Sequence, residues 1–248
     1  MAARRMLTGE EYARLFWGVV KHECGRPVGS GGLLPSEPTG REHRGLRALV
    51  LITLLGECGL RVGEAVTVRW SAVDGGLAGE PVFLLGAAAA KGRRSRHVVL
   101  TPIAAWVLTE WRAESMRSNE HLVRGYVLGR SGARGPYTAR AAQLAVQMRG
   151  RRHLGCDITP HTLRRTFGER CRQHGDLRLA QLMLGHRRLA STERYLGGSV
   201  AECVELAARI SGDVSEVAPA EVDPVRWAVG SVLRSWQPAA RKGKRGRS

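Results

Sequence analysis

The residues best suited to chemistry lie between positions 158 and 196, in a stretch that holds three histidines, many arginines and one tyrosine. Its first part predicts a helix with Thr159 as N-cap and Pro160 as first helical residue. His161 then lies in the first turn, and Arg164 follows three residues later on the same face. Free N–H groups at a helix N-terminus, an imidazole and a guanidinium together suit the binding of a phosphate.

Each of these residues also has an ordinary structural interpretation. A single histidine is more often a core or surface residue than a catalyst, and His174 keeps that interpretation. Taken alone, Arg164 is interpreted as a residue on a solvated helix face. Tyr195 is interpreted as an ordinary half-buried aromatic residue. The functional interpretation therefore depends on the residues that accompany them.

A second group of polar residues surrounds the first in sequence. The segment LGH at 184–186 places a glycine after a helix, which turns the chain and directs His186 away from the apolar face of that helix. Tyr195 follows nine residues later. Upstream, the segment GLRVGE at 59–64 places Arg61 and Glu64 three residues apart, just after a buried helix.

The elements that position these residues are mostly helices. Thr8 and Glu11 form a capping box before a helix over 10–21, and an apolar stretch over 44–55 predicts a central core helix that Gly59 can end. The remaining helices are expected at 103–116, 139–147, 161–173, 177–184, 191–195, 200–210 and 224–236.

Three short segments have the pattern of strands, at 65–70, 81–85 and 97–100, with a turn at 91–96 before the last of them. They predict a small antiparallel three-stranded sheet. Lys91 stands at the tip of the predicted hairpin, where its long side chain can swing into a groove. The fold class is therefore α+β and mainly α.

The charge of the chain indicates a polyanionic partner. Lysine and arginine total 39 against 22 acidic residues, which gives a formal net charge of +17. Five of these positive charges lie in residues 237–248, and the body without them still carries +12. Nucleic acid fits best because contacts between basic side chains and phosphates release counterions. A generally basic, soluble surface is the alternative.

Several classes of protein are excluded. The most apolar stretch, at 48–55, is far shorter than the roughly 20 residues of a membrane span, and the N-terminus lacks the pattern of a secretion signal. The five cysteines are spread without a C-x-x-C pair, which favours reduced thiols in a cytosolic protein without a zinc site. They are Cys24, Cys58, Cys156, Cys171 and Cys203.

In combination, these motifs resemble the tyrosine site-specific recombinases and integrases. The segments GLRVGE, KGRRSRHVVL, HTLRR, LGH and TERY follow in the order and at the spacing of that family, over about residues 7–196. The resemblance implies the helical catalytic fold of the family, with its small antiparallel sheet. It also implies a set of active-site positions, none of them substituted: Arg61, Lys91, His161, Arg164, His186 and Tyr195.

The resemblance implies an enzyme that breaks and rejoins DNA. Tyr195 attacks a phosphodiester in line, which leaves a 3′-phosphotyrosyl link and a free 5′ hydroxyl. Arg61 and Arg164 bind the non-bridging oxygens and stabilise the charge of the transition state, in place of the metal ion that many nucleases use. Neither a cofactor nor a metal is expected.

The other positions handle protons or orient the arginines. Lys91 is the general acid for the departing 5′ oxygen. His161 helps to move the tyrosine proton, and His186 donates to the phosphate. Glu64 orients Arg61 and takes no direct part in the chemistry.

The family also implies an assembly on double-stranded DNA. Four protomers surround two DNA sites and exchange strands through a Holliday junction, in integration, excision, resolution or inversion. Such assemblies pass a C-terminal helix to a neighbour, and residues 200–210 are our candidate because Val204, Leu206 and Ile210 form an apolar stripe. Packing of this helix on its own chain is the alternative.

We expect a catalytic domain at 1–197 with a Gly- and Pro-rich loop at 25–40, a helical extension at 198–236, and a basic tail at 237–248 that is disordered without DNA. Typical members carry a core-binding domain before the catalytic one, whereas the resemblance here begins near residue 7. The chain therefore resembles a catalytic-domain-only recombinase of a bacterium, phage or mobile element, acting in the cytoplasm, or a fragment of a longer one. An accessory protein or the tail can supply the missing grip on DNA.

Further basic residues are candidates for contacts with DNA phosphates, although charge on a hairpin tip or tail is also explained by solvation alone. They are Arg93, Arg94, Arg96, Arg165, Arg241, Lys242, Lys244 and Arg245.

Two other functions fit the same residues. A type IB topoisomerase uses the same chemistry to nick and reseal one strand, although the GLR motif and the spacing from LGH to the tyrosine favour a recombinase. A catalytically silent DNA-binding regulator is the second alternative, and the intact set of active-site positions argues against it.

Overall fold

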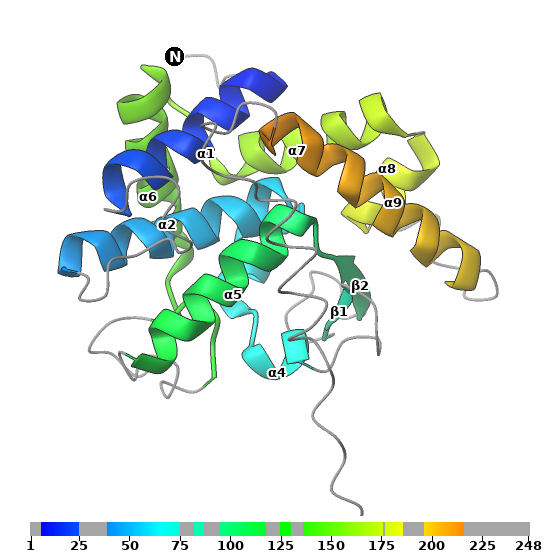
Figure 1. Ribbon diagram of the computed structural model, residues 1–248, viewed down its shortest axis with the longest axis horizontal. Helices are drawn as coiled ribbons and strands as arrows, with labels where there is room; N and C mark the ends of the chain where they lie inside the picture. Colours follow the sequence, from blue (N-terminus) through cyan, green and yellow to red (C-terminus); the bar gives the residue numbers. More distant parts are fainter. Residues whose placement is uncertain are drawn as a thin grey trace, which may run out of the picture.

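A computed structural model of the chain describes residues 6–24, 39–74, 82–86, 95–117, 125–129, 136–175, 177–185 and 196–215. Within these ranges the protein is mainly helical, with one small antiparallel sheet (Figure 1). The elements, in chain order, are α1 (Gly9–Glu23), α2 (Gly40–Gly56), α3 (Val62–Thr67), α4 (Trp70–Asp74), β1 (Val82–Leu85), β2 (Arg96–Val99), α5 (Pro102–Arg117), α6 (Ala139–Leu154), α7 (Pro160–His174), α8 (Leu177–Leu184) and α9 (Leu196–Ser215).

The first two helices begin with the same capping arrangement. The Thr8 hydroxyl accepts the Glu11 N–H and the Glu11 carboxylate accepts the Thr8 N–H, which confirms the predicted capping box of α1. Thr39 and Glu42 make the same pair of hydrogen bonds at the start of α2. We predicted that α2 begins at residue 44. Apolar spacing gives no sign of the first turn of α2, because that turn is polar and is started by this second capping box.

Residues 65–70 are not a strand, contrary to our prediction. Residues 65–67 end α3 and Trp70 begins α4, and Val68 and Arg69 lie between these two short helices. The carboxylate of Glu64 accepts the backbone N–H of Arg61, and this contact begins α3 and overrides the alternating pattern that follows. Arg69 retains a single antiparallel bridge to Tyr126.

The predicted hairpin is present, and its sheet has two strands in the described part of the chain rather than the three we expected. β1 pairs antiparallel with β2, with Val82 opposite Val99 and Leu85 opposite Arg96. Arg96 therefore belongs to the strand, and not to the turn predicted at 91–96. The tip that carries Lys91 lies outside the described residues.

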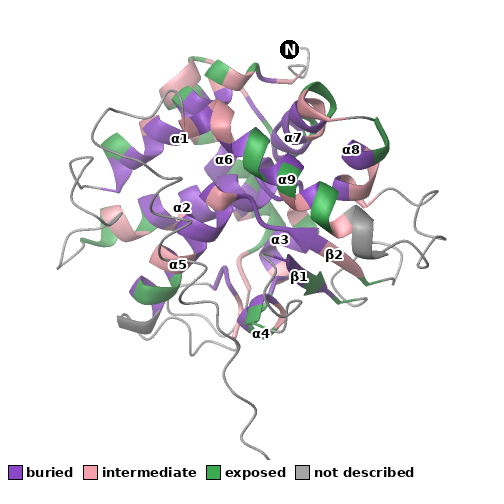
Figure 2. Ribbon diagram, turned by 45° about the vertical axis from the view of Figure 1, so that its right-hand side comes forward, coloured by how far each residue is buried: buried purple, intermediate pink, exposed green. Residues whose placement is uncertain are grey.

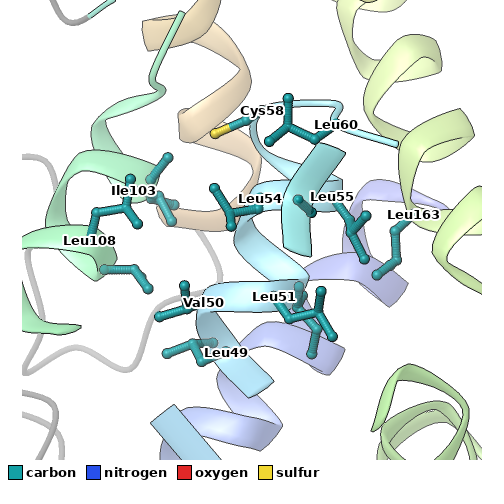
Figure 3. Close-up of a cluster of buried hydrophobic side chains, with 14 of the residues drawn as sticks. Leu49, Val50, Leu51, Leu54, Leu55, Cys58, Leu60, Ile103, Leu108 and Leu163 are labelled. Carbon is teal, nitrogen blue, oxygen red and sulfur yellow. The ribbon is translucent and has the colours of Figure 1, made fainter. Parts of the chain in front are cut away.

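The core is built around α2, which contacts α1, α3, α5, α6 and α7. Nearly every residue of α2 from Gly45 onward is buried, which places this helix in the centre of the molecule (Figures 1 and 2). Its leucines meet Ile103 and Leu108 of α5 on one side and Leu163 of α7 on another (Figure 3). The predicted central core helix is confirmed.

The later helices follow the prediction with small shifts of their ends. α8 has the predicted bounds, whereas α6 continues seven residues beyond the predicted end at 147 and stops at Gly155, which is left-handed with a φ of 69°. The N–H of a left-handed glycine donates to the last carbonyls of a helix and ends it there. Apolar spacing alone does not locate such an end. Several predicted segments lie outside the described residues: the loop at 25–40 except for its last two residues, the helices at 191–195 and 224–236, and the tail.

The last described helix, α9, packs on its own chain. Cys203, Leu206, Ala207 and Ile210 are buried in a second apolar cluster together with residues of α7 and α8. The indole N–H of Trp17 also donates to the carbonyl of Val214, over 2.8 Å, and joins α9 to α1. Of the two arrangements left open for this helix, the structure has the one in cis.

Candidate active site

The start of α7 places His161 and Arg164. The Thr159 hydroxyl accepts the N–H of Thr162, and the Thr162 hydroxyl accepts the N–H of Thr159, so two threonines form the cap and Pro160 takes the first turn as predicted. His161 is exposed in that turn, whereas Arg164 is only 7% exposed. Arg164 therefore does not lie on a solvated helix face.

Arg164 joins the ends of two other helices. One of its terminal nitrogens donates to the carbonyl of Gly59, after α2, and the other donates to the carbonyl of Leu184 over 2.8 Å, at the end of α8. Gly59 has a φ of 60°, and a Cβ atom there would lie 2.4 Å from the Phe167 ring, so only glycine fits this approach. Arg164 thus donates to the last carbonyl of α8, which the helix leaves without a partner, and to a carbonyl in the turn after α2.

Glu64 holds Arg61 in place from one turn further along α3. Its Oε1 accepts from Nη1 of Arg61 over 3.0 Å, and its Oε2 accepts the Arg61 backbone N–H over 2.8 Å. The Arg61 side chain is 38% exposed and that of Glu64 is 2% exposed. The buried carboxylate therefore fixes the guanidinium while leaving other N–H donors of Arg61 free to meet a ligand.

Glu64 is the shared partner of three arginines. Nη2 of Arg96 lies 3.1 Å from its Oε2, and Nη1 of Arg164 lies 4.0 Å from the same oxygen. Burial alone would raise the pKa of Glu64, but Arg96 and Arg61 outweigh burial and hold that pKa below its usual value. The carboxylate is therefore ionised at neutral pH.

The cluster carries more positive than negative charge. Burial, together with the charges of Arg61 and Arg96, lowers the pKa of Arg164 to about 10. That value still leaves the guanidinium protonated at neutral pH, so three cations face one carboxylate. Such an excess favours binding of an anion, and forked N–H donors match the geometry of a phosphate.

A hollow of about 290 Å³ lies between Val62 of α3, the helix α6 and the start of α7. Its polar lining includes Arg140, Gln143 and Gln147, which recur at helical spacing on α6, together with His161. These α6 residues were not among the candidates selected from the sequence. Their spacing of three and four positions was visible there, but nothing indicated that this face of α6 lies next to His161.

The structure brings together Arg61, Glu64 and Arg164, and it places His161 one turn before Arg164 on α7. Arg165 is exposed. Arg96, selected as a surface contact, has only 14% of its side chain exposed. The other candidates lie outside the described residues: Lys91, His186, Tyr195, Arg93, Arg94, Arg241, Lys242, Lys244 and Arg245.

Tyr12 is unsuited to act as a nucleophile. It is completely buried, and burial, followed by the negative charge of Glu57, raises its pKa well above the usual value. Tyr126 and Tyr137 are half-buried, and the hydroxyl of Tyr126 accepts a hydrogen bond from Arg69. The chain has four tyrosines, and the fourth is Tyr195.

The described part of the chain offers no group of metal ligands and no helix suited to a bilayer. Within it, no three His, Cys, Asp or Glu side chains gather closely enough to bind a metal ion. The helices found there are too short or too polar to span a membrane.

A match to a known protein family covers every motif selected from the sequence. The model of the phage integrase family matches residues 37–201, which is more than half of the chain and includes all the active-site positions named from the sequence. The chain belongs to the phage integrase family.

Curated relatives carry recombinase names. A tyrosine recombinase XerC of Xylella fastidiosa (strain 9a5c) is 36% identical over 153 residues, which cover 61% of this chain and 48% of the relative. A tyrosine recombinase XerC of Brucella melitensis is 30% identical over 183 residues, 73% of this chain and 54% of the relative. This phage integrase family member thus spans about half the length of the curated relatives it matches.

Solved structures share the fold. The XerA recombinase superposes with a TM-score of 0.56 at 19% identity, over 82% of this chain and 64% of that one. The XerH recombinase, in a pre-cleavage complex with its difH substrate, superposes with a TM-score of 0.56 at 19% identity, over 78% of this chain and 50% of that one.

Proposed function

We propose that this chain is a site-specific DNA recombinase that breaks and rejoins DNA through a 3′-phosphotyrosyl intermediate. The observation that carries the proposal is the cluster of Arg61, Arg96 and Arg164 around the single carboxylate of Glu64. It lies in a member of the phage integrase family, and a surplus of buried and half-buried guanidinium groups suits a phosphodiester.

In the proposed reaction, the Tyr195 oxygen attacks phosphorus in line while its proton passes to His161. The P–O5′ bond breaks, and the departing oxygen takes a proton from Lys91. Arg61 and Arg164 donate to the non-bridging oxygens, and His186 adds a further donor. Because one phosphodiester replaces another, a 5′ hydroxyl from a second strand can reverse the step and join the DNA in a new order.

We also propose that the active assembly contains four protomers on two double-stranded DNA sites, and that the remaining basic candidates, apart from the largely buried Arg96, hold DNA phosphates outside the reacting position. A net charge of +17 supports a DNA partner, because each phosphate contact by lysine or arginine releases counterions. An accessory protein or another part of a longer chain would then complete the grip on DNA.

Covalent capture tests this proposal and does not require the sequence of the DNA site. The protein is mixed with a pool of nicked duplexes of randomised sequence, from which the short 5′-hydroxyl strand is lost after cleavage. We expect the wild type to form adducts that survive denaturation, and the sequences recovered from them to converge on one site.

Tyr195→Phe should form no adduct, whereas Tyr126→Phe should react like the wild type, because Tyr126 is a half-buried residue bonded to Arg69. Adduct formation by Tyr195→Phe, or its loss in Tyr126→Phe alone, would show that another tyrosine is the nucleophile. DNA binding without any adduct from the wild type would overturn the catalytic proposal.

A further inference from the structure

Arg96 begins strand β2, five residues after Lys91, and its side chain lies inside the molecule. Nη2 donates to Oε2 of Glu64 over 3.1 Å, and Nη1 donates to the carbonyl of Met183 over 3.4 Å. With 14% of its side chain exposed, Arg96 joins the hairpin, α3 and the end of α8. A contact with DNA at the hairpin tip would need a far more exposed side chain.

The aliphatic part of Arg96 packs against Gly185. A Cβ atom on Gly185 would lie 2.4 Å from Cδ of Arg96, and Gly185 has a left-handed φ of 66°. Any larger residue would therefore displace Arg96 as well as strain the backbone. Gly185 immediately precedes His186, so the contact lies at the point where the chain leaves α8 for the remaining active-site positions.

Two arginines share the end of α8. Arg96 binds the carbonyl of Met183 and Arg164 binds that of Leu184, the last two residues of the helix. Carbonyls at a helix C-terminus lack partners within the helix and carry its partial negative charge, so cations there are favourable. Both arginines also face Glu64, which makes the end of α8 and the Glu64 cluster one connected unit.

We propose that Arg96 is a positioning residue for strand cleavage. It fixes the hairpin strand that follows Lys91, and the helix end that precedes His186, against the Glu64 cluster that holds Arg61 and Arg164. The inference rests on the proposed function. Small displacements of groups that must align with a reacting phosphate can cost a factor of about 100 in rate, so a residue that never touches the DNA can control cleavage.

Three variants separate positioning from mere phosphate binding. Arg96→Met keeps the aliphatic stem over Gly185 and removes the guanidinium, and Arg96→Lys keeps the charge without the fork. Arg172→Met is the matched control, because Arg172 is 56% exposed and pairs only with Glu169 among the contacts of α7 that the structure describes. Each is measured for DNA affinity and for the single-turnover rate of adduct formation on the duplex recovered by covalent capture.

We expect Arg96→Met to slow adduct formation at saturating DNA by at least about tenfold, with the dissociation constant for DNA within about threefold of wild type. Arg96→Lys should recover part of the rate, and Arg172→Met should match the wild type. In a Glu64→Gln background, Arg96→Met should cause a smaller further loss than it causes in the wild type, because the ion pair between the two residues is already absent there. A rate like that of wild type, or a defect that appears only as weaker DNA binding, would overturn the inference.

Hydrogen exchange gives a readout that needs no cleavage. In the wild type, the Arg61 N–H donates to Glu64 and the Gly185 N–H donates to the Leu182 carbonyl. We expect both amides to exchange at least about tenfold faster in Arg96→Met at unchanged global stability. Unchanged exchange in Arg96→Met would overturn the positioning role even in a protein that cleaves DNA. Faster exchange in Arg96→Met, together with no adduct from the wild type, would reject the proposed function alone.

Discussion

Arg170 donates from Nη1 to Oε1 of Glu57 over 2.6 Å, and neither side chain is more than 1% exposed. Nε of the same guanidinium donates to Asp213 over 3.0 Å, and Nη2 donates to the carbonyl of Ile210. One buried cation therefore joins the end of α2 and the last turns of α9 to α7. Four hydrogen bonds from this guanidinium reach two carboxylates and the carbonyls of Gly56 and Ile210, which makes burial of the charge tolerable.

Replacing Arg170 should destabilise the fold severely. Arg170→Met leaves Glu57 buried without its cation, and the expected loss in the free energy of unfolding is about 3–5 kcal/mol, measured by urea denaturation. The double variant Glu57→Gln with Arg170→Met should recover part of this loss. Arg172→Met, which breaks an exposed pair, should change stability by less than about 1 kcal/mol. Equal effects of Arg170→Met and Arg172→Met would refute this account.

Glu23 should make the stability of the protein depend on acid pH. Burial by itself would raise the pKa of Glu23, but hydrogen bonds and charge from His153 and Arg149 lower it from 4.5 to about 2. Because the folded-state pKa is depressed, the carboxylate stabilises the fold above about pH 4.5, and this contribution is lost as the pH falls toward 2. One pKa unit corresponds to about 1.4 kcal/mol, so about 3 kcal/mol is involved.

The measurement compares wild type with Glu23→Gln, in which the amide keeps the shape and loses the charge. The difference between their free energies of unfolding should be largest near about pH 6 and should shrink steadily down to about pH 2.5. Glu169→Gln is the control, because Glu169 belongs to an exposed pair with Arg172. The free energies of unfolding of wild type and Glu169→Gln should differ little at every pH. A difference between wild type and Glu23→Gln that does not vary with pH would contradict the assignment.

Gly45 is required by the close approach of α1 and α2. A Cβ atom there would lie 2.2 Å from the backbone oxygen of Glu23, which cannot move without shifting α1. Gly45→Ala should therefore lower the free energy of unfolding by about 1–3 kcal/mol. Gly212 lies in α9 with nothing within 4 Å of the same position, so Gly212→Ala should stabilise by up to about 1 kcal/mol. Thermal unfolding of the two variants would show shifts of opposite sign.

Arg61 and Arg164 should respond differently to substitution, although both belong to the candidate active site. Arg61→Met should reduce single-turnover cleavage by a factor of about 100–1000 while thermal stability stays near that of wild type, because its side chain is 38% exposed. Arg164→Met should lower both cleavage and stability, since it leaves the carbonyls of Gly59 and Leu184 without their donor. Equal stability of the two variants would contradict this division.

Local signals in the sequence were sufficient for most helices. These signals act within a few residues, so the bounds that they predict are close to those observed. They are the capping box at Thr8, the threonine and proline that begin α7, and the glycine after α8. The strand expected at 65–70 failed because alternation over six residues is weak evidence. The contact between Glu64 and the Arg61 backbone decided the structure of that segment instead.

The candidate site was predictable by residue type but not by contact. The motifs selected Arg61, Glu64 and Arg164, which the fold brings together. They could not show that Arg96 turns inward to Glu64, because this contact joins residues 32 positions apart and depends on how the hairpin packs against α3 and α8. Basic charge near a predicted turn suggested a surface role, whereas tertiary packing gave the residue a buried one.

The fixed ends of α8 and α9 have a consequence for the tyrosine. Gly185 is held against Arg96, and Leu196 begins a helix whose buried face is packed on its own chain, so residues 186–195 connect two anchored points. Under the proposed function, a substitution that loosens either anchor would therefore affect the activity of Tyr195 without altering a catalytic side chain.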